Sequence, residues 1–243
     1  MKSVDDAASI GKFPAAVAVN MAAVLIDVNK TFRRGRDEVN ALRNVSLQIH
    51  SRSFVAITGP SGAGKTTLLQ VLGGIERPDS GKVCVGGKDI GELSEAERTV
   101  FRRRNLGFVF QFFNLLPTLT AWENVAVPLT LDGARRSVAR TRAKEMLDLM
   151  GLAKRAEHHP RELSGGEMQR TAIARALISE PALILADEPT GNLDSETGRS
   201  VLRLLRQVVD DRGGTVVMVT HSLEAADVAD RSIRFVDGVP LPA

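Results

Sequence analysis

A glycine-rich segment near residue 60 constrains the fold of this chain more than any other feature. It matches the pattern G-x-x-x-x-G-K-[ST] at every fixed position, with the residues Gly59, Pro60, Ser61, Gly62, Ala63, Gly64, Lys65 and Thr66. An apolar run, residues 54–58, precedes it, and residues 65–72 have the pattern of a helix. A strand, a glycine-rich turn and a helix in this order open a parallel α/β unit. The segment therefore predicts an α/β fold with a phosphate-binding loop.

The residue types of this loop suit a nucleotide. Glycines allow the backbone to curl, so that its N–H groups point at phosphate oxygens, and the helix that follows adds the positive end of its dipole. We expect Lys65 to reach the β- and γ-phosphates and the Thr66 hydroxyl to bind Mg²⁺, with Thr67 beside them. Because kinases, GTPases, helicases and transport ATPases all use such a loop, other residues must indicate its purpose.

Two adjacent acids follow a second apolar run. Residues 182–186 lead directly into Asp187 and Glu188. Ligands of open α/β sheets sit at the carboxyl ends of the strands, and neighbouring residues of a strand point to opposite sides. We therefore expect different roles: Asp187 holds Mg²⁺, and Glu188 orients and polarises an attacking water. The alternative is a pair of solvated acids at a strand end.

A second helix start resembles an anion site. Ser164, Gly165 and Gly166 precede a helical pattern over residues 166–179. Ser164 is also suited to cap that helix, and both functions are compatible. One nucleotide rarely needs two such helix starts from one molecule, so the pattern poses a geometric question.

The remaining pattern indicates one α/β domain over residues 21–243. Alternating apolar residues over 24–28, 42–49 and 81–85 predict a small antiparallel sheet near the N-terminus. Residues 93–165 have few strand signals, so we expect a helical insertion there, including one helix over 136–150 that Gly151 ends. A helix over 196–210 and a buried strand over 216–220 complete the pattern.

Composition excludes several classes. The chain has 243 residues, a net charge of +3, 4% aromatic residues and no Tyr, so we expect no nucleic-acid partner. The single cysteine, Cys84, cannot form an internal disulfide, and no apolar stretch reaches the roughly 18 residues that span a bilayer. Residues 1–20 contain Asp5 and Asp6 and a short apolar run, so we expect a disordered extension, with Met21 as a second possible start.

In their order along the chain, these motifs resemble the nucleotide-binding subunit of ABC transporters, over about residues 22–238. The resemblance implies a P-loop NTPase core of the RecA type, with an N-terminal antiparallel β subdomain and an inserted α-helical subdomain. It also implies that Ser164, Gly165 and Gly166 form the signature segment, which binds the γ-phosphate of ATP held by another copy. A head-to-tail dimer with two ATP molecules at its interface would explain why one chain has two anion-binding helix starts.

Single residues match further elements of the family. Gln111 corresponds to the Q-loop glutamine that senses Mg²⁺ and the attacking water, and Asp194 lies in the D-loop that crosses the dimer seam. His221 corresponds to the switch histidine that contacts the γ-phosphate. Phe32 stands where the family commonly has a Tyr that stacks on adenine; it keeps the stacking face and lacks the hydroxyl.

Residues 111–125 and 189–194 are similar to the branch that releases lipoproteins and exports macrolides. The resemblance implies an ATPase peripheral to the cytoplasmic face of the inner membrane, which powers export or extraction of a hydrophobic or lipid-linked substrate. The permease would be a separate integral membrane protein, and it would select the substrate. We interpret five apolar residues as candidates for the groove that receives it: Phe112, Phe113, Leu115, Leu116 and Trp122.

Other functions remain open at this point. The closest alternative is a division-type ABC ATPase, which transmits force to cell-wall hydrolases and transports nothing. A soluble ABC protein of translation or DNA repair is disfavoured, because the chain has one cassette and no long coiled coil. The signature segment and His221 argue against a P-loop kinase.

Overall fold

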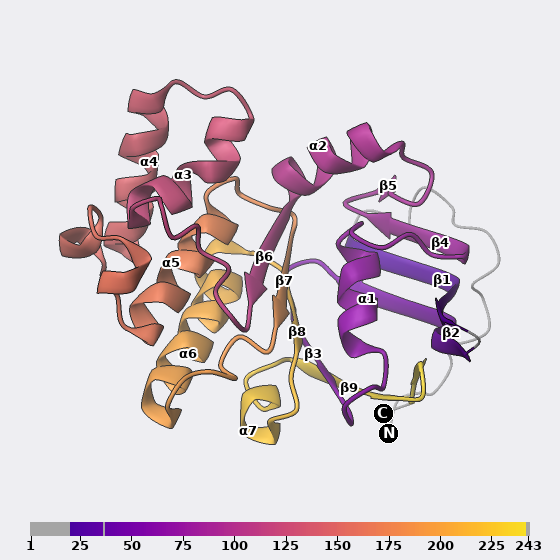
Figure 1. Cartoon of the computed structure of the whole chain (residues 1–243). Coiled ribbons are helices and arrows are strands. Elements are labelled where there is room, and N and C mark those ends of the chain that lie inside the picture. Colours follow the sequence, from indigo (N-terminus) through magenta and orange to yellow (C-terminus); the bar gives the residue numbers. More distant parts are fainter. Residues whose placement is uncertain (1–19, 36, 242–243) are drawn as a thin grey trace.

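The computed structural model describes residues 20–35 and 37–241 (Figure 1). The expected N-terminal extension therefore lies outside the described residues, apart from Asn20. None of the helices in the described ranges is both long and apolar enough to span a bilayer.

The antiparallel sheet expected near the N-terminus is confirmed. Its strand order is β2-β1-β4-β5, with bounds β1 Met21–Arg34, β2 Asp37–His50, β4 Ser80–Val85 and β5 Lys88–Asp89. The alternation of β1 is interrupted by a bulge at Asp27, whose φ is 49°. Because the bulge adds a residue, Leu25 and Val28 both reach the core.

A second sheet carries the strands expected after the glycine-rich loop and after residue 181. Its order is β10-β9-β3-β8-β7-β6, and all neighbours are parallel except β10 and β9. The bounds are β3 Phe54–Thr58, β6 Leu106–Phe110, β7 Leu183–Asp187, β8 Val216–Val219, β9 Arg231–Val236 and β10 Val239–Pro240. Val219 pairs with both Ile57 and Asp187, so these strands end at one edge.

Helices and the small sheet cover opposite faces of this parallel sheet (Figure 1). Ala56, Ile184 and Met218 point into one core, and their neighbours Val55, Leu185 and Val217 point into the other. The first core packs on α3 Ala121–Leu131, α4 Arg136–Leu149, α5 Gly165–Leu177 and α6 Ser195–Arg212. The second packs on α1 Lys65–Leu72 and the antiparallel sheet. The central strands are uninterrupted apolar runs because both faces of the parallel sheet are buried.

Residues 93–165 are not wholly helical, which corrects the expected insertion. They begin with α2 Glu95–Asn105 and the edge strand β6, which pairs with β7. The strand is only five residues long and follows a highly charged helix, so the sequence offers little to distinguish it. The helical part begins at α3 and contains two short 3₁₀ turns, η2 Ala153–Arg155 and η3 Pro160–Glu162. The helix expected over 136–150 is present as α4, and Gly151 follows it with φ 70°.

Glu157 ties the helical part together. Its carboxylate lies 2.8 Å from an Arg140 nitrogen and 2.7 Å from Lys144 Nζ, and it accepts a hydrogen bond from Trp122 Nε1. Hydrogen bonds from Lys144 and Arg140 lower the pKa of Glu157 to about 2. The loop after α4 is thereby held against both α3 and α4.

We expect Glu157→Gln to lower the free energy of unfolding at pH 7 by up to about 1 kcal/mol, because the pair is half exposed. The carboxylate's contribution is fully present above its usual pKa of 4.5 and is lost as the pH falls from 4.5 to about 2. Urea unfolding at pH 7 and at pH 3 tests this. Glu145→Gln is the matched control, since this exposed acid of α4 forms no ion pair within the described residues. Equal effects of the two substitutions at pH 7 would contradict the assignment.

Candidate nucleotide site

The glycine-rich loop connects β3 to α1 and adopts a conformation that requires its glycines. Gly59 and Gly64 have φ values of 143° and 95°. A Cβ on Gly59 would lie 2.0 Å from the Phe235 carbonyl oxygen, and one on Gly64 would lie 2.1 Å from the Ala41 carbonyl oxygen. The loop backbone is therefore pressed against β9 and β2, and its outer residues remain exposed: Pro60, Ser61 and Gly62.

The N-terminus of α1 lies open at this loop. Its N-cap is Gly64, no side chain of the described residues caps it, and its first turn has no acid. Five other helices are capped by a side chain, from Ser94, Thr120, Ser164, Asp194 and Ser222. The first N–H groups of α1 are therefore available to an anion, and the helix dipole favours negative charge there.

Lys65 occupies the centre of the loop. Its ammonium donates hydrogen bonds of 2.8 Å to the carbonyl oxygens of Gly59 and Pro60, and only 8% of the residue is exposed. Ala63 is buried beside it, and Thr67 is half-buried on the first turn of α1. The charge is thus positioned by the loop itself.

Thr66 and Asp187 face each other at the strand ends, with Thr66 Oγ1 3.4 Å from Asp187 Oδ1. Burial raises the pKa of the Asp187 carboxyl; Glu188 adds to this, whereas Thr66 and Lys65 oppose it. A cation between the two oxygens would relieve this cost. Mg²⁺ fits the pair, because it takes oxygen ligands, of which proteins commonly supply one or two and phosphates and water the rest. Accordingly, the described residues contain no cluster of three or more acids, His or Cys that would hold a metal by itself.

Glu188 and His221 form a second pair at the same edge. Glu188 has a left-handed φ of 46°, and its Oε1 lies 2.9 Å from His221 Nδ1. Glu188 therefore contacts His221, whereas Asp187 contacts Thr66. The His221 side chain is 70% exposed, so the pair is accessible. Both residues line a hollow of about 200 Å³ together with Asp194.

Gln111 follows β6, and its amide hydrogen bonds go to Asn192 rather than to Thr66 or Asp187. Gln111 Nε2 donates to Asn192 Oδ1 over 3.3 Å, and Asn192 Nδ2 donates to the Gln111 carbonyl over 3.0 Å. This mutual contact joins the end of β6 to the segment before α6. Asn192 was not among the expected site residues.

The signature segment lies in a separate hollow. Ser164 caps α5 in a capping box with Glu167, which confirms its capping role, although the hydrogen bond to its Oγ is 3.3 Å long. The hollow beside it is lined by Ser164, Gly166, Arg170, Glu196, Thr197, Ser200, Val201 and Arg203. None of these belongs to the glycine-rich loop. Asp194 caps α6 through the N–H groups of Glu196 and Thr197. Within one chain, the glycine-rich loop and the signature segment therefore do not form a single binding site.

Residues 42–191 match the ABC transporter family. The chain belongs to this family. A Thermotoga maritima ABC transporter ATP-binding protein is 47% identical over 88% of this chain and 91% of its own length. The lipoprotein-releasing system ATP-binding protein LolD of Geobacter metallireducens is also 47% identical, over 88% of this chain and 95% of its own. The macrolide export ATP-binding/permease protein MacB of Syntrophobacter fumaroxidans is 46% identical over 90% of this chain and 31% of its own length.

The comparison with solved structures agrees with the family assignment. The dimeric post-hydrolysis structure of the ATP-binding cassette MJ0796, bound to ADP and Pi, has a TM-score of 0.84 and 42% identity, covering 90% of this chain and 97% of that one. The expected α/β cassette fold is therefore correct, and the chain is an ATP-binding ABC ATPase subunit.

In this ABC cassette, Phe32 is half-buried and has a neighbour that sequence reasoning missed. Lys30 Nζ lies 5.1 Å from the ring centroid and is held by Glu76 and Asp79 at 3.2 and 3.5 Å. An ammonium therefore covers one face of the ring. The sequence does indicate that Lys30 lies beside Phe32, because residues two apart on a strand share a face.

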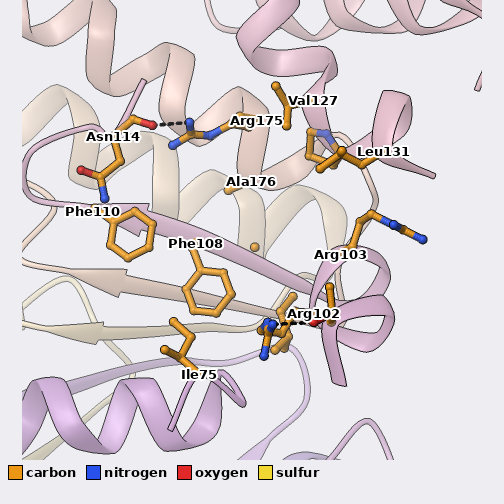
Figure 2. A pocket seen from close by; sticks show the side chains of 14 residues that line it. Ile75, Arg102, Arg103, Phe108, Phe110, Asn114, Val127, Leu131, Arg175 and Ala176 are labelled. Atoms are coloured by element: carbon orange, nitrogen blue, oxygen red, sulfur yellow. Dashed lines mark hydrogen bonds between the residues drawn. The ribbon is translucent and has the colours of Figure 1, made fainter. Parts of the chain in front are cut away.

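A groove of about 380 Å³ opens between β6, α2, α3 and α5 (Figure 2). Its surface is mostly apolar, with Ile75, Phe108, Val127 and Leu131 among the lining residues. The cationic lining residues are Arg102, Arg103 and Arg175, and no carboxylate of the described residues lines it. None of the five apolar residues expected to form a groove lines this one. Trp122 is only 5% exposed and belongs to the core, whereas Phe112 is 72% exposed.

We expect Gly59→Ala to lower the free energy of unfolding by about 2–5 kcal/mol and to abolish nucleotide binding, because the methyl group collides with the β9 backbone. The matched control is Gly62→Ala, where φ is 79° but nothing lies within 4 Å of the added Cβ. That change should cost only about 1–2 kcal/mol. Urea unfolding and titration with a fluorescent ATP analogue measure both effects; equal losses in the two variants would be inconsistent with this explanation.

Proposed function

We propose that this cassette hydrolyses ATP with Mg²⁺ to power export or extraction of a hydrophobic or lipid-linked substrate through a separate membrane permease. The single observation that carries the ATPase chemistry is the convergence of Lys65, Thr66, Asp187 and Glu188 on one sheet edge. The substrate class rests on relatives described as lipoprotein-releasing and macrolide export proteins. The permease is inferred from the descriptions of the relatives: LolD is the ATP-binding protein of a lipoprotein-releasing system, and MacB is an ATP-binding/permease protein.

ATP binding follows from the loop. The phosphates take over the Lys65 hydrogen bonds now made to Gly59 and Pro60, and the open N–H groups of α1 add to them. Thr66 and Asp187 would hold Mg²⁺, with the Gln111 amide oxygen as a further ligand once its side chain has released Asn192, and the ion would supply positive charge against the phosphates. Adenine stacks on the face of Phe32 that Lys30 leaves open.

Hydrolysis uses the Glu188–His221 pair. Glu188 orients a water and accepts its proton as the water oxygen attacks the γ-phosphorus, and the bond to the ADP oxygen breaks. His221 contacts the γ-phosphate, for which its exposed position is suitable. The hydrogen bond between the pair keeps Glu188 in position before ATP arrives.

A second copy completes each site. Since the signature hollow contains no residue of the glycine-rich loop, its Ser164, Gly165 and Gly166 serve ATP bound to the other chain, with Asp194 at the seam. Ser164 Oγ accepts the capping bond from the Glu167 N–H, so its own O–H can donate to a phosphate oxygen. The dimeric MJ0796 structures, at 42% and 43% identity, support this arrangement.

We expect Glu188→Gln to lower steady-state ATPase activity by about 10²- to 10⁴-fold and to accumulate a stable ATP-bound dimer. The substitution keeps the shape of the side chain and removes the base. Size-exclusion chromatography with light scattering, in ATP and in ADP, measures the dimer. Glu180→Gln, at an exposed acid distant from the sheet edge, is the control. A monomeric Glu188→Gln protein in ATP would argue against the dimeric cycle.

The groove is the docking site of the permease in this proposal. An apolar surface that carries three arginines and, among the described residues, no carboxylate suits a short amphipathic segment with an acidic residue. Docking there brings the cassette to the cytoplasmic face of the inner membrane as a peripheral subunit.

We expect Leu131→Asp to abolish co-purification of the permease from detergent-solubilised membranes and to leave ATP binding intact. Leu131 is 65% exposed and lines the groove, so the change should not unfold the protein. Leu149→Asp is matched in chemistry and exposure, at 59%, and lies outside the groove. Retention of the permease by Leu131→Asp would contradict docking in the groove.

The proteins that accompany the permease test the substrate class. When the Glu188→Gln protein is captured with ATP, a lipoprotein carrier or an export adaptor beside the permease supports transport. A cell-wall hydrolase instead would favour the division-type alternative.

A further inference from the structure

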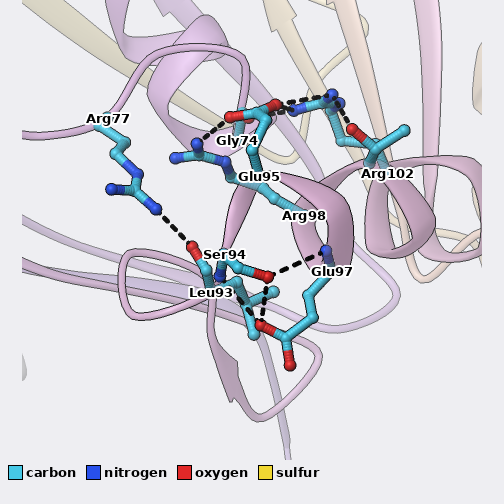
Figure 3. Close-up of polar contacts among 9 residues, drawn as sticks. Gly74, Arg77, Leu93, Ser94, Glu95, Glu97, Arg98 and Arg102 are labelled. Atoms are coloured by element: carbon cyan, nitrogen blue, oxygen red, sulfur yellow. Dashed lines mark hydrogen bonds and ion pairs between the residues drawn. The ribbon is translucent and has the colours of Figure 1, made fainter.

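Arg102 connects two surfaces that are otherwise distinct. Its side chain lines the groove (Figure 2), and its guanidinium donates a 2.6 Å hydrogen bond to the Gly74 carbonyl at the end of α1 (Figure 3). The N-terminus of that same helix forms the nucleotide loop. One side chain of α2 therefore contacts the docking groove and the far end of the phosphate-binding helix.

The Gly74 carbonyl belongs to the turn that terminates α1. The N–H groups of Gly73, Gly74 and Ile75 bond to carbonyls of the last turns of the helix, and Gly74 has a left-handed φ of 61°. A cation at a helix C-terminus stabilises its dipole. The helix has eight residues, hence a length of about 12 Å, so only a short and continuous helix separates this turn from the nucleotide loop.

The Arg102 guanidinium has several hydrogen-bond partners and can change between them. Besides Gly74 it bonds to Thr99 Oγ1 at 2.8 Å, whereas its contacts to Glu95 are longer, at 3.3 and 3.4 Å. Its neighbour Arg98 is buried, packs on Gly74 and shares Glu95 with it (Figure 3). The Arg102 side chain is 23% exposed, so its head can turn towards an acidic group in the groove.

We propose that Arg102 is a positioning residue that transmits occupancy of the groove to α1, and so to the nucleotide loop. An acidic group of the docked permease segment draws the guanidinium from Gly74, and the end of α1 shifts. This rests on the docking proposed above. This connection is separate from Gln111, which bonds to Asn192 and does not line the groove.

The test compares Arg102→Met with Arg104→Met. Arg104 is on the same helix, bonds to Asp132 and does not line the groove. The readouts are the amount of permease captured with the cassette from native membranes and the ratio of ATPase activity between the reconstituted complex and the isolated cassette. We expect Arg102→Met to reduce that ratio by about two- to thirtyfold and Arg104→Met to leave it unchanged. An Arg102→Met complex with the wild-type ratio would overturn the proposal.

A second variant keeps the proposal testable if the Arg102→Met substitution abolishes docking. If Arg102→Met captures no permease, Arg102→Lys retains the positive charge but cannot bond to Gly74 and Thr99 together with a planar fork. It should capture the permease and still show a reduced ratio; a full ratio would overturn the proposal.

Hydrogen exchange of the isolated cassette needs no permease. Amides 73–76 should exchange faster in Arg102→Met than in Arg104→Met, and equal rates would show that Arg102 does not hold the end of α1. A wild-type cassette that captures no permease would count against docking, while the exchange result would still decide the contact of Arg102 with α1.

Discussion

The parallel register of β3, β8, β7 and β6 is the constraint on which the site depends. Because Val219 pairs with Ile57 on one side and Asp187 on the other, the nucleotide loop, the two acids and His221 all leave the sheet at the same edge. No loop needs to be long to bring these groups together. The same register places Gln111, which follows β6, beside the segment after β7.

Burial on both faces keeps that register in place. Successive residues of each central strand enter different cores, so a shift by one residue would exchange the side chains facing α5 and α6 with those facing α1. The site is therefore built on a rigid sheet, whereas the groove is formed between the sheet edge and helices on both sides of it. The nucleotide site and the groove meet at β6, which lines the groove and leads into Gln111.

Much of the fold and of the nucleotide site could be predicted from local sequence. The glycine-rich loop, the apolar strands around it and the acids at the end of β7 have patterns whose cause is local, and the structure contains these elements within one or two residues. Strand β6 was missed because a five-residue edge strand next to a charged helix has little periodicity. The groove could not be predicted, since its lining comes from residues as distant as Ile75 and Arg175. The partner of Gln111 likewise depends on a tertiary contact, whereas Lys30, beside Phe32, is a local neighbour on β1.

The hydrogen bonds of Lys65 to its own loop have a consequence for the entropy of ligand binding. Its ammonium donates to two carbonyl oxygens of the loop, and because an ammonium has three N–H groups, the third can still reach a ligand. A lysine side chain that is free in solution loses much conformational entropy when it is fixed. In this fold most of that loss accompanies folding rather than ligand binding, because the buried Lys65 side chain is already held by its own loop.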